Sequence, residues 1–191
     1  MGCYTVPERA MSSRIILTYE DYAALPDDGK RYELHEGELS VTPSPTTRHQ
    51  LVIGNLYLIL APHVRATGRG QLFLSPLDCI MTNITVVEPD LVYVDDSRRG
   101  LVSARAVEGA PTLAVEVLSP STTHIDRRRK MALYAKHDVT WYWIVDPDAR
   151  TIDVYRLQGD AYGLDARLGG AEPRMLPPFP DLPLDPAAIW P

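Results

Sequence analysis

The chain has 191 residues, 45% of them hydrophobic, which is enough to bury the core of one domain. Its net charge of −6 argues weakly against a protein that coats nucleic acid, because Lys and Arg supply most non-specific affinity for phosphates. The only two cysteines, Cys3 and Cys79, support neither a disulfide framework nor a cysteine-rich zinc site.

Residues 1–17 are expected to form an N-terminal segment without fixed structure, and residues 18–191 a single domain. The sequence contains no uncharged apolar run of about 18 residues, the length that a membrane helix needs. Its start also lacks the apolar stretch of a secretory signal. We therefore expect a cytoplasmic protein with no membrane partner.

The first predicted elements are a short helix and a hairpin. Thr18 can cap a helix over residues 18–25, with Asp21 at the third helical position. Residues 31–43 predict a hairpin that turns at Glu36-Gly37. Alternation then puts the apolar side chains on one face, which we expect to look into the core, and the polar ones on the other. The apolar set is Tyr32, Leu34, Leu39 and Val41, and the polar set is Glu33, His35, Glu38 and Ser40.

A long buried helix should start after Thr46 or Thr47 and fray between Pro62 and Gly68. Strands are predicted over residues 71–81, 85–94 and 112–119, then a helix over 126–136 and a hairpin over 141–157. The Pro-rich tail, 169–191, is expected to wrap the domain without regular structure. Its predicted anchors are Leu176, Phe179, Leu182, Leu184 and Trp190. This order indicates a mixed sheet flanked by helices, an α/β or α+β fold.

Two carboxylates interrupt apolar strands. Glu116 shares a strand face with Ala114 and Leu118, where an ionised group is costly unless it is paired or binds a metal. Asp90 follows Pro89, which marks a strand edge or bulge. The structural alternatives are an ion pair between Glu116 and an arginine, and a turn aspartate at position 90.

Carboxylates on neighbouring strands repel each other unless a cation lies between them. Mg²⁺ suits such a site, because two acidic side chains, a backbone carbonyl such as that of Val117, and waters would satisfy it. Lys130 lies 14 positions after Glu116 on the next helix and could reach the same end of the sheet. Its alternative is a solvated lysine paired with Asp126.

Several motifs occur together in order: RYELHEGEL, PSPTTRHQ, SPLDC, VEPDLVYV, LAVEVLSPST, a helix with Lys130, and YWIVDPDARTIDVY. From about Thr18 to Leu184 the chain resembles the bacterial Uma family of endonuclease-like proteins in the PD-(D/E)XK superfamily. The resemblance implies a restriction-endonuclease-like fold with an N-terminal hairpin. In it, Asp90 and Glu116 bind a divalent metal, Mg²⁺ or Mn²⁺, and Lys130 helps to activate water.

One position departs from the superfamily pattern. The short motif has Lys two residues after the acid, where this chain has Leu118. In the family the lysine is taken to lie on the following helix, which matches Lys130. Glu33 resembles the family's additional N-terminal acid, which binds metal or water. His49 and Asp78 are weaker candidates, for which helix capping and structural hydrogen bonds are the alternatives.

These residues predict a Mg²⁺-dependent endonuclease, a hydrolase in which a metal-polarised water attacks a phosphodiester of DNA while Lys130 orients or deprotonates that water. A second hypothesis is a catalytically silent member of the fold that binds nucleic acid or protein. A third is a homodimer built through the aromatic run Trp141, Tyr142 and Trp143, for which core packing is the alternative.

Overall fold

The computed structural model describes residues 15–119 and 123–191. The predicted N-terminal segment therefore lies outside the described residues up to position 14, and Cys3 with it. The helices are α1 (Tyr19–Ala23), α2 (Thr47–Thr67), a 3₁₀ helix (Asp96–Leu101), a π-helical segment (Ile125–Lys130), α3 (Met131–Lys136) and α4 (Pro186–Ile189). The strands are β1 (Arg31–His35), β2 (Glu38–Thr42), β3 (Gly70–Leu74), β4 (Cys79–Thr82), β5 (Thr85–Val87), β6 (Leu91–Asp95), β7 (Leu113–Val117), β8 (Trp141–Asp146), β9 (Thr151–Gln158), β10 (Ala161–Leu168), β11 (Arg174–Leu176) and β12 (Phe179–Leu184).

Two sheets organise the part of the chain that the structure describes. A six-stranded sheet has the order β10-β9-β8-β7-β6-β3, and a four-stranded sheet has the order β2-β1-β5-β4. In the larger sheet only β7 and β8 pair in parallel, and they are joined through the π-helical segment and α3. Its other neighbours are antiparallel. The predicted mixed sheet flanked by helices is therefore confirmed.

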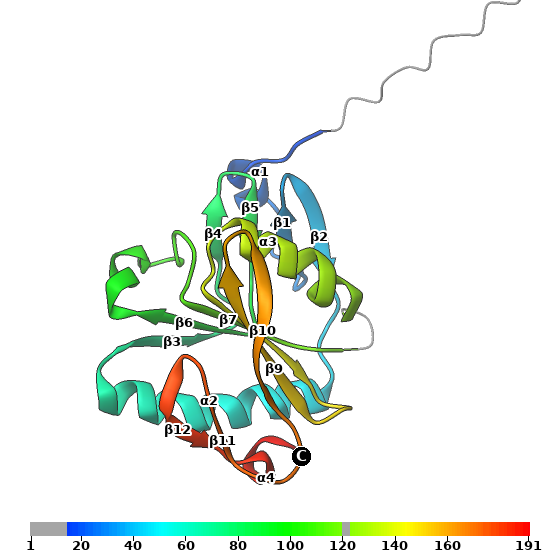
Figure 1. Cartoon of the computed structure of the whole chain (residues 1–191). Coiled ribbons are helices and arrows are strands. Elements are labelled where there is room, and N and C mark those ends of the chain that lie inside the picture. Colours follow the sequence, from blue (N-terminus) through cyan, green and yellow to red (C-terminus); the bar gives the residue numbers. More distant parts are fainter. Residues whose placement is uncertain (1–14, 120–122) are drawn as a thin grey trace, which may run out of the picture.

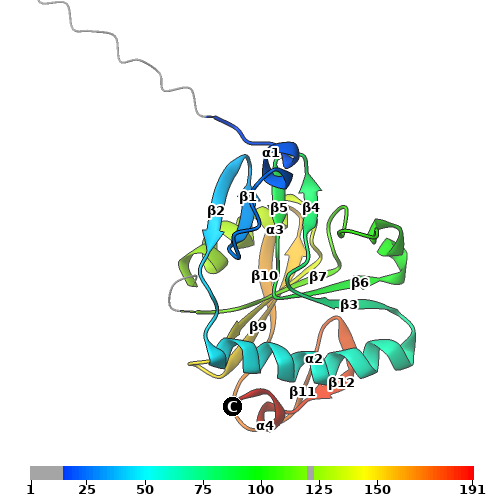
Figure 2. The same cartoon turned by 180° about the vertical axis from the view of Figure 1, so that it is seen from behind.

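The two faces of the large sheet are covered by different elements. Helix α2 and the C-terminal elements β11, β12 and α4 lie on one face, whereas α3 and the small sheet lie on the other (Figures 1 and 2). Val115 and Val117 of β7 pack with Leu56 and Leu60 of α2. Ala114 and Leu118 instead belong to the core that includes Tyr134 of α3. As predicted, β7 alternates, and Glu116 falls on the α3 face.

Two segments that were each predicted as one strand are divided between the sheets. Residues 71–81 form β3 of the large sheet and β4 of the small one, with Pro76 in between. Residues 85–94 likewise form β5 and β6, on either side of Pro89. Proline lacks the N–H that a sheet ladder needs, so each strand ends there and the chain crosses to the other sheet. This crossing brings Asp90 to the place where the two sheets meet.

The C-terminal tail corrects another prediction, because it contains β11, β12 and α4. Its regular structure was missed since the segment is rich in proline, yet Pro183 still pairs across the hairpin from Met175 and Pro186 starts α4. The predicted anchors do pack into the core, with Leu176 and Leu184 fully buried. Strand β10 was not predicted at all, because its sequence alternates poorly and half of its residues are exposed.

Further predictions concern local structure, namely the N-terminal caps of α1 and α2 and the C-terminal end of α2. Thr18 caps α1 in a capping box with Asp21, and Thr46 caps α2, as expected. Helix α2 continues through Pro62 to Thr67 and ends at Gly68, which adopts a left-handed conformation, so no fraying begins at the proline. Cys79 is buried.

The aromatic run of β8 is part of the core. Tyr142 and Trp143 are fully buried, and the indole of Trp143 donates a 2.8 Å hydrogen bond to the carbonyl of Pro177. Core packing is thus confirmed for these side chains, which leaves them unavailable to a partner surface. A homodimer remains a prediction. Among the described helices, none is long and apolar enough to span a membrane.

Candidate active site

Asp90 and Glu116 are brought level by the pairing of their strands. Strands β6 and β7 are antiparallel with Leu91 opposite Val115, so the residue before β6 faces Glu116 across the ladder. Oδ2 of Asp90 accepts a 2.8 Å hydrogen bond from the Val117 amide, which ties the Asp90 loop to the end of β7. Both carboxylates are about 4% exposed, so they lie together in a nearly dry environment. Val117 lines the same pocket, and metal ligation by its carbonyl stays a prediction.

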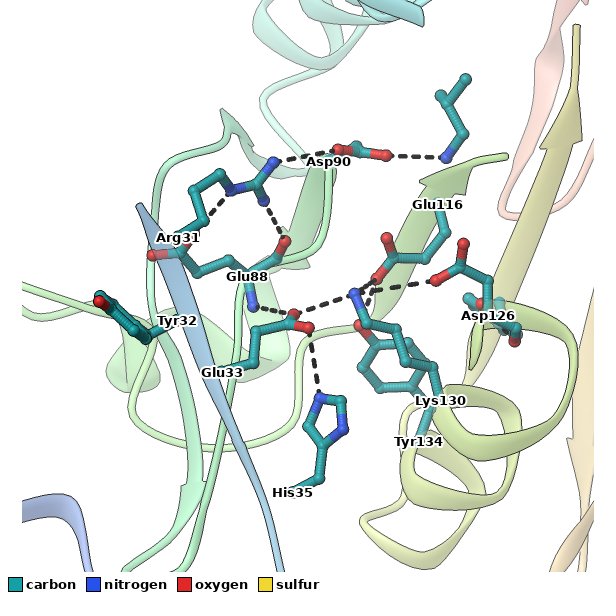
Figure 3. Close-up of polar contacts among 12 residues, drawn as sticks. Arg31, Tyr32, Glu33, His35, Glu88, Asp90, Glu116, Asp126, Lys130 and Tyr134 are labelled. Atoms are coloured by element: carbon teal, nitrogen blue, oxygen red, sulfur yellow. Dashed lines mark hydrogen bonds and ion pairs between the residues drawn. The ribbon is translucent and has the colours of Figure 1, made fainter. Parts of the chain in front are cut away.

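Lys130 enters this cluster from the π-helical segment. Its Nζ lies 2.9 Å from Oε1 of Glu116, 2.9 Å from Oε1 of Glu33 and 3.9 Å from Oδ1 of Asp126 (Figure 3). A π turn inserts an extra residue into the helix and is often found at functional sites. Here Asp126 and Lys130, four residues apart, are both buried. The solvated-lysine alternative is therefore wrong, because Lys130 is only 5% exposed and reaches three carboxylates.

Glu33 joins the cluster because the first hairpin is oriented differently from the prediction. Its polar face looks inward: Glu33 and His35 are at most 2% exposed, and His35 Nε2 lies 3.2 Å from Oε2 of Glu33. On the apolar face Leu34 is buried, but Leu39 is 38% and Val41 52% exposed. The expectation that this whole face looks into the core was wrong, since Lys130 and the neighbouring Arg129, which donates to the His35 carbonyl, cover the polar face instead.

Arg31, Glu88 and His49 complete the surroundings of Asp90. His49 Nε2 lies 3.2 Å from Oδ2 of Asp90, held there by the first turn of α2, where Thr46 Oγ1 accepts from the His49 amide. Arg31 donates from Nε to Oε2 of Glu88 at 2.9 Å, and its Nη1 lies 3.8 Å from Oδ1 of Asp90 (Figure 3). Asp90 is therefore flanked by two cationic or donor side chains in addition to the Val117 amide.

The charges of this cluster shift its acid–base equilibria in opposite directions. Burial raises the pKa of Glu116 well above its ordinary value; Lys130 acts against this shift, while the nearby Asp126, Asp90 and Glu33 add to it. For Glu33 burial also acts upward, but Lys130, His35 and the Glu88 amide dominate and lower its pKa. The fold thus favours the ionised form of Glu33 and disfavours that of Glu116.

Lys130 and Tyr134 remain protonated in this environment. Burial alone would lower the pKa of Lys130, but Glu116, Glu33 and Asp126 overcome it and raise the pKa. Burial together with Glu116 raises the pKa of Tyr134, whose hydroxyl donates to Oε1 of Glu116 at 2.6 Å. Both groups are therefore hydrogen-bond donors to the same carboxylate oxygen.

The charged side chains Arg31, Glu33, Asp90, Glu116, Asp126 and Lys130 line one pocket of about 130 Å³ between the two sheets and the π-helical segment. Its lining is Arg31, Glu33, Ser40, Val41, Thr42, Pro43, Pro45, His49, Asp90, Glu116, Val117, Ser119, Ile125, Asp126 and Lys130. The four predicted acidic and basic residues Asp90, Glu116, Lys130 and Glu33 are all among them, and so is the weaker candidate His49.

Asp78 lies outside the pocket. Its Oδ1 accepts a 2.7 Å hydrogen bond from the Tyr22 hydroxyl, so the structural interpretation of this residue is the one that holds. Sequence reasoning did not single out Arg31, Glu88, His35 or Tyr134. Strand alternation from Glu33 could have found Arg31 and His35, which lie two positions to either side on the same face. Glu88 and Tyr134 carry no comparable signal.

The donor set fits a hard divalent cation better than zinc. No group of three or more His, Cys, Asp or Glu side chains in residues 15–119 and 123–191 is arranged to hold a metal ion. Mg²⁺ does not need such a cage, because it keeps several waters and binds through one or two carboxylates. Oε1 of Glu116 is taken by Lys130 and Tyr134, while no donor from the described residues reaches its Oε2. Within the described part of the chain, Oε2 of Glu116 is thus the oxygen that a cation next to Asp90 could contact.

Glu33→Gln is expected to destabilise the metal-free protein by about 3 kcal/mol at neutral pH, since it breaks a buried ion pair with Lys130. The fold lowers the pKa of Glu33, so the charged carboxylate contributes stability above its unfolded value of 4.5. That contribution is lost as the pH falls through the lowered folded value. Urea unfolding at pH 7 and at pH 4 measures the difference in the free energy of unfolding between variant and wild type. This difference should be smaller at pH 4. A difference that does not change with pH would contradict the electrostatic explanation.

A crystal structure of similar fold is that of a protein described as "a putative nuclease belonging to DUF820 from Anabaena variabilis ATCC 29413". The TM-score is 0.75 over 91% of this chain and 97% of the other, with 21% sequence identity. The two proteins share a fold. No curated protein matches the chain.

A family model described as "Uma2: Putative restriction endonuclease" matches residues 19–187. This span covers nearly the whole chain and includes every side chain of the pocket. The protein belongs to the Uma2 family, as its sequence motifs predicted.

Proposed function

We propose that the protein is a metal-dependent endonuclease that hydrolyses phosphodiester bonds in DNA. The observation that carries the proposal is the convergence of Asp90, Glu116 and Lys130 on one pocket, although they come from three separate parts of the chain. Membership of a family described as "Putative restriction endonuclease" supports the same reaction class. A purely structural role would not require a buried lysine among so many carboxylates.

Asp90 and Glu116 would hold Mg²⁺ or Mn²⁺, the hard cations that carboxylate oxygens prefer. When bound, such an ion lowers the pKa of water and stabilises negative charge on phosphate oxygens. Glu33 would fix Lys130 rather than bind the ion, because its Oε1 accepts from both Lys130 and the Glu88 amide. Asp126 acts on Lys130 from the other side.

Lys130 would act as a donor and not as a general base. Its raised pKa keeps the ammonium charged at neutral pH, so it holds no lone pair with which to accept a proton. A charged ammonium can orient the attacking water or stabilise charge on the phosphate. Of the two roles considered for Lys130, orienting the water and deprotonating it, we therefore propose the first.

The test is cleavage of DNA by the purified protein. We expect turnover in Mg²⁺ or Mn²⁺, loss of turnover in EDTA, and slow turnover in Ca²⁺, which occupies carboxylate sites with looser geometry. Because the net charge is −6, assays belong at low ionic strength, where phosphate contacts are least screened. Supercoiled, linear and single-stranded substrates should all be compared.

An Asp90→Asn, Lys130→Ala double variant is the control for contaminating nucleases. If wild type and double variant give the same trace of cleavage across all metals, the proposed activity is wrong. The catalytically silent binder would then be the remaining explanation of the pocket, and DNA binding in EDTA and Ca²⁺ would test it.

A further inference from the structure

Arg31 is the cation of the pocket that the hydrolytic roles above do not use. It is the first residue of β1, two positions before Glu33 on the same strand face, and its side chain is 23% exposed in the pocket. The side chain of Lys130, by contrast, is 7% exposed and directed at Glu33, Glu116 and Asp126. The two cations therefore lie at different ends of the carboxylate cluster, Arg31 next to Asp90 and Lys130 next to Glu116 (Figure 3).

Glu88 holds the guanidinium of Arg31 by one side. Nε donates to the Glu88 carboxylate at 2.9 Å and Nη2 donates to the Glu88 carbonyl at 2.8 Å. Nη1 lies 3.8 Å from Oδ1 of Asp90, which is beyond hydrogen-bonding distance. Within residues 15–119 and 123–191, the N–H groups of Nη1 and one N–H of Nη2 have no hydrogen-bond acceptor. Glu88 thus fixes the orientation of the guanidinium, while the remaining N–H groups are left to donate to a ligand.

The N–H groups of Arg31 that lack an acceptor can bind an anion that enters the pocket. A phosphodiester that enters this pocket meets the negative charge of Glu33, Asp90, Glu116 and Asp126 and needs a cation to offset it. The planar fork of arginine matches phosphate oxygens, and Glu88 has already fixed its orientation, so little side-chain entropy remains to be lost on binding.

We propose that Arg31 is the phosphate-binding residue of this pocket, positioned by Glu88, and that it contacts one phosphate of the DNA next to Asp90. The inference rests on the proposed function, since it names the group that holds the substrate of the same site. The competing explanation is structural: Arg31 would only tie β1 to the Glu88–Asp90 turn.

The dependence of DNA binding on salt separates these explanations. Each phosphate contact adds about 0.9 to the slope of log affinity against log salt concentration on duplex DNA. We expect Arg31→Gln to reduce that slope by about this amount, measured by fluorescence anisotropy of a labelled duplex in Ca²⁺, which permits binding with little cleavage. Arg31→Lys should keep the slope but bind more weakly, because lysine retains the charge without the fork. Lys30→Gln removes the same charge from the adjacent residue, whose ammonium pairs with Asp28 outside the pocket, and should leave the slope unchanged.

Arg31→Gln leaves the carboxylate of Glu88 without its cation, and this alone destabilises the variant. The Arg31→Gln, Glu88→Gln double variant removes both charges of the pair and should show the same reduced slope. If the wild type binds DNA and the slope of either variant equals that of the wild type, Arg31 is only a structural tie and the inference fails while the endonuclease proposal stands. If the wild type neither binds nor cleaves DNA under any of these conditions, the proposed function fails and Arg31 has no substrate to hold.

Discussion

Replacing Asp90 by Asn or Glu116 by Gln is expected to lower Mg²⁺-dependent DNA cleavage by at least about a thousandfold, which corresponds to about 4 kcal/mol of transition-state stabilisation. Each substitution removes one negative charge from the proposed ligands and keeps the shape of the side chain. Affinity for Mn²⁺, measured by calorimetric titration, should fall in parallel. Unchanged affinity in both variants would mean that these carboxylates serve structural contacts only.

The fold should survive both substitutions. The fold raises the pKa of Glu116, so its ionised form is unfavourable in the metal-free protein, and glutamine removes that charge while it can still accept from Lys130 and Tyr134. Unfolding in EDTA is therefore expected to be no easier for Glu116→Gln than for the wild type. Asp78→Asn makes the same chemical change outside the pocket, where Asp78 bonds Tyr22, and serves as the control for cleavage and metal affinity.

Replacing Lys130 by Met is expected to cost about 3–5 kcal/mol of stability in EDTA, the cost of leaving one side of a buried ion pair without its partner. Methionine preserves the length and the apolar stem of the side chain. It removes the ammonium that lies 2.9 Å from both Glu33 and Glu116, so three acidic groups remain buried together. Urea unfolding followed by circular dichroism gives the difference directly.

Lys136→Met is the matched control, because Lys136 lies on α3 with its side chain 63% exposed and pairs with Glu36 on the surface. Its stability should stay within about 0.5 kcal/mol of the wild type. Mn²⁺ should restore part of the stability of Lys130→Met, about 2.7 kcal/mol at a hundredfold excess over its dissociation constant. If both lysine variants unfold alike and neither responds to Mn²⁺, the cluster around Lys130 is not a cation site.

Asp90 and Glu116 could be singled out from the sequence because a charged residue within an apolar strand leaves a local signal. Glu116 stands between Ala114 and Leu118 on one face of an apolar strand, and Asp90 follows a proline that must end a ladder. Each anomaly is visible within a few residues. The order of the motifs along the chain then indicated the family and, through it, Lys130. The short superfamily motif alone would have placed the lysine at position 118, where this chain has Leu118.

The orientation of the first hairpin was decided only by tertiary structure. Alternation correctly separates Leu39 and Val41 from Glu33 and His35, but it does not say which set is buried. The polar face is the inner one because Lys130, nearly a hundred residues later, supplies the charge that makes burial of Glu33 favourable. Apolar side chains on β2, an edge strand, could be left exposed at smaller cost than an unpaired carboxylate could be buried.

The sequence by itself thus determined the class of fold, the strand that bears Glu116 and the capped starts of α1 and α2, since all three depend on periodicity and local hydrogen bonds. Only the tertiary structure decided how residues 71–81 and 85–94 divide between two sheets, that β10 and the Pro-rich tail add strands, and that Arg31 faces Asp90. These features depend on contacts between residues far apart in the chain, and the local sequence pattern around each residue does not indicate its distant partner.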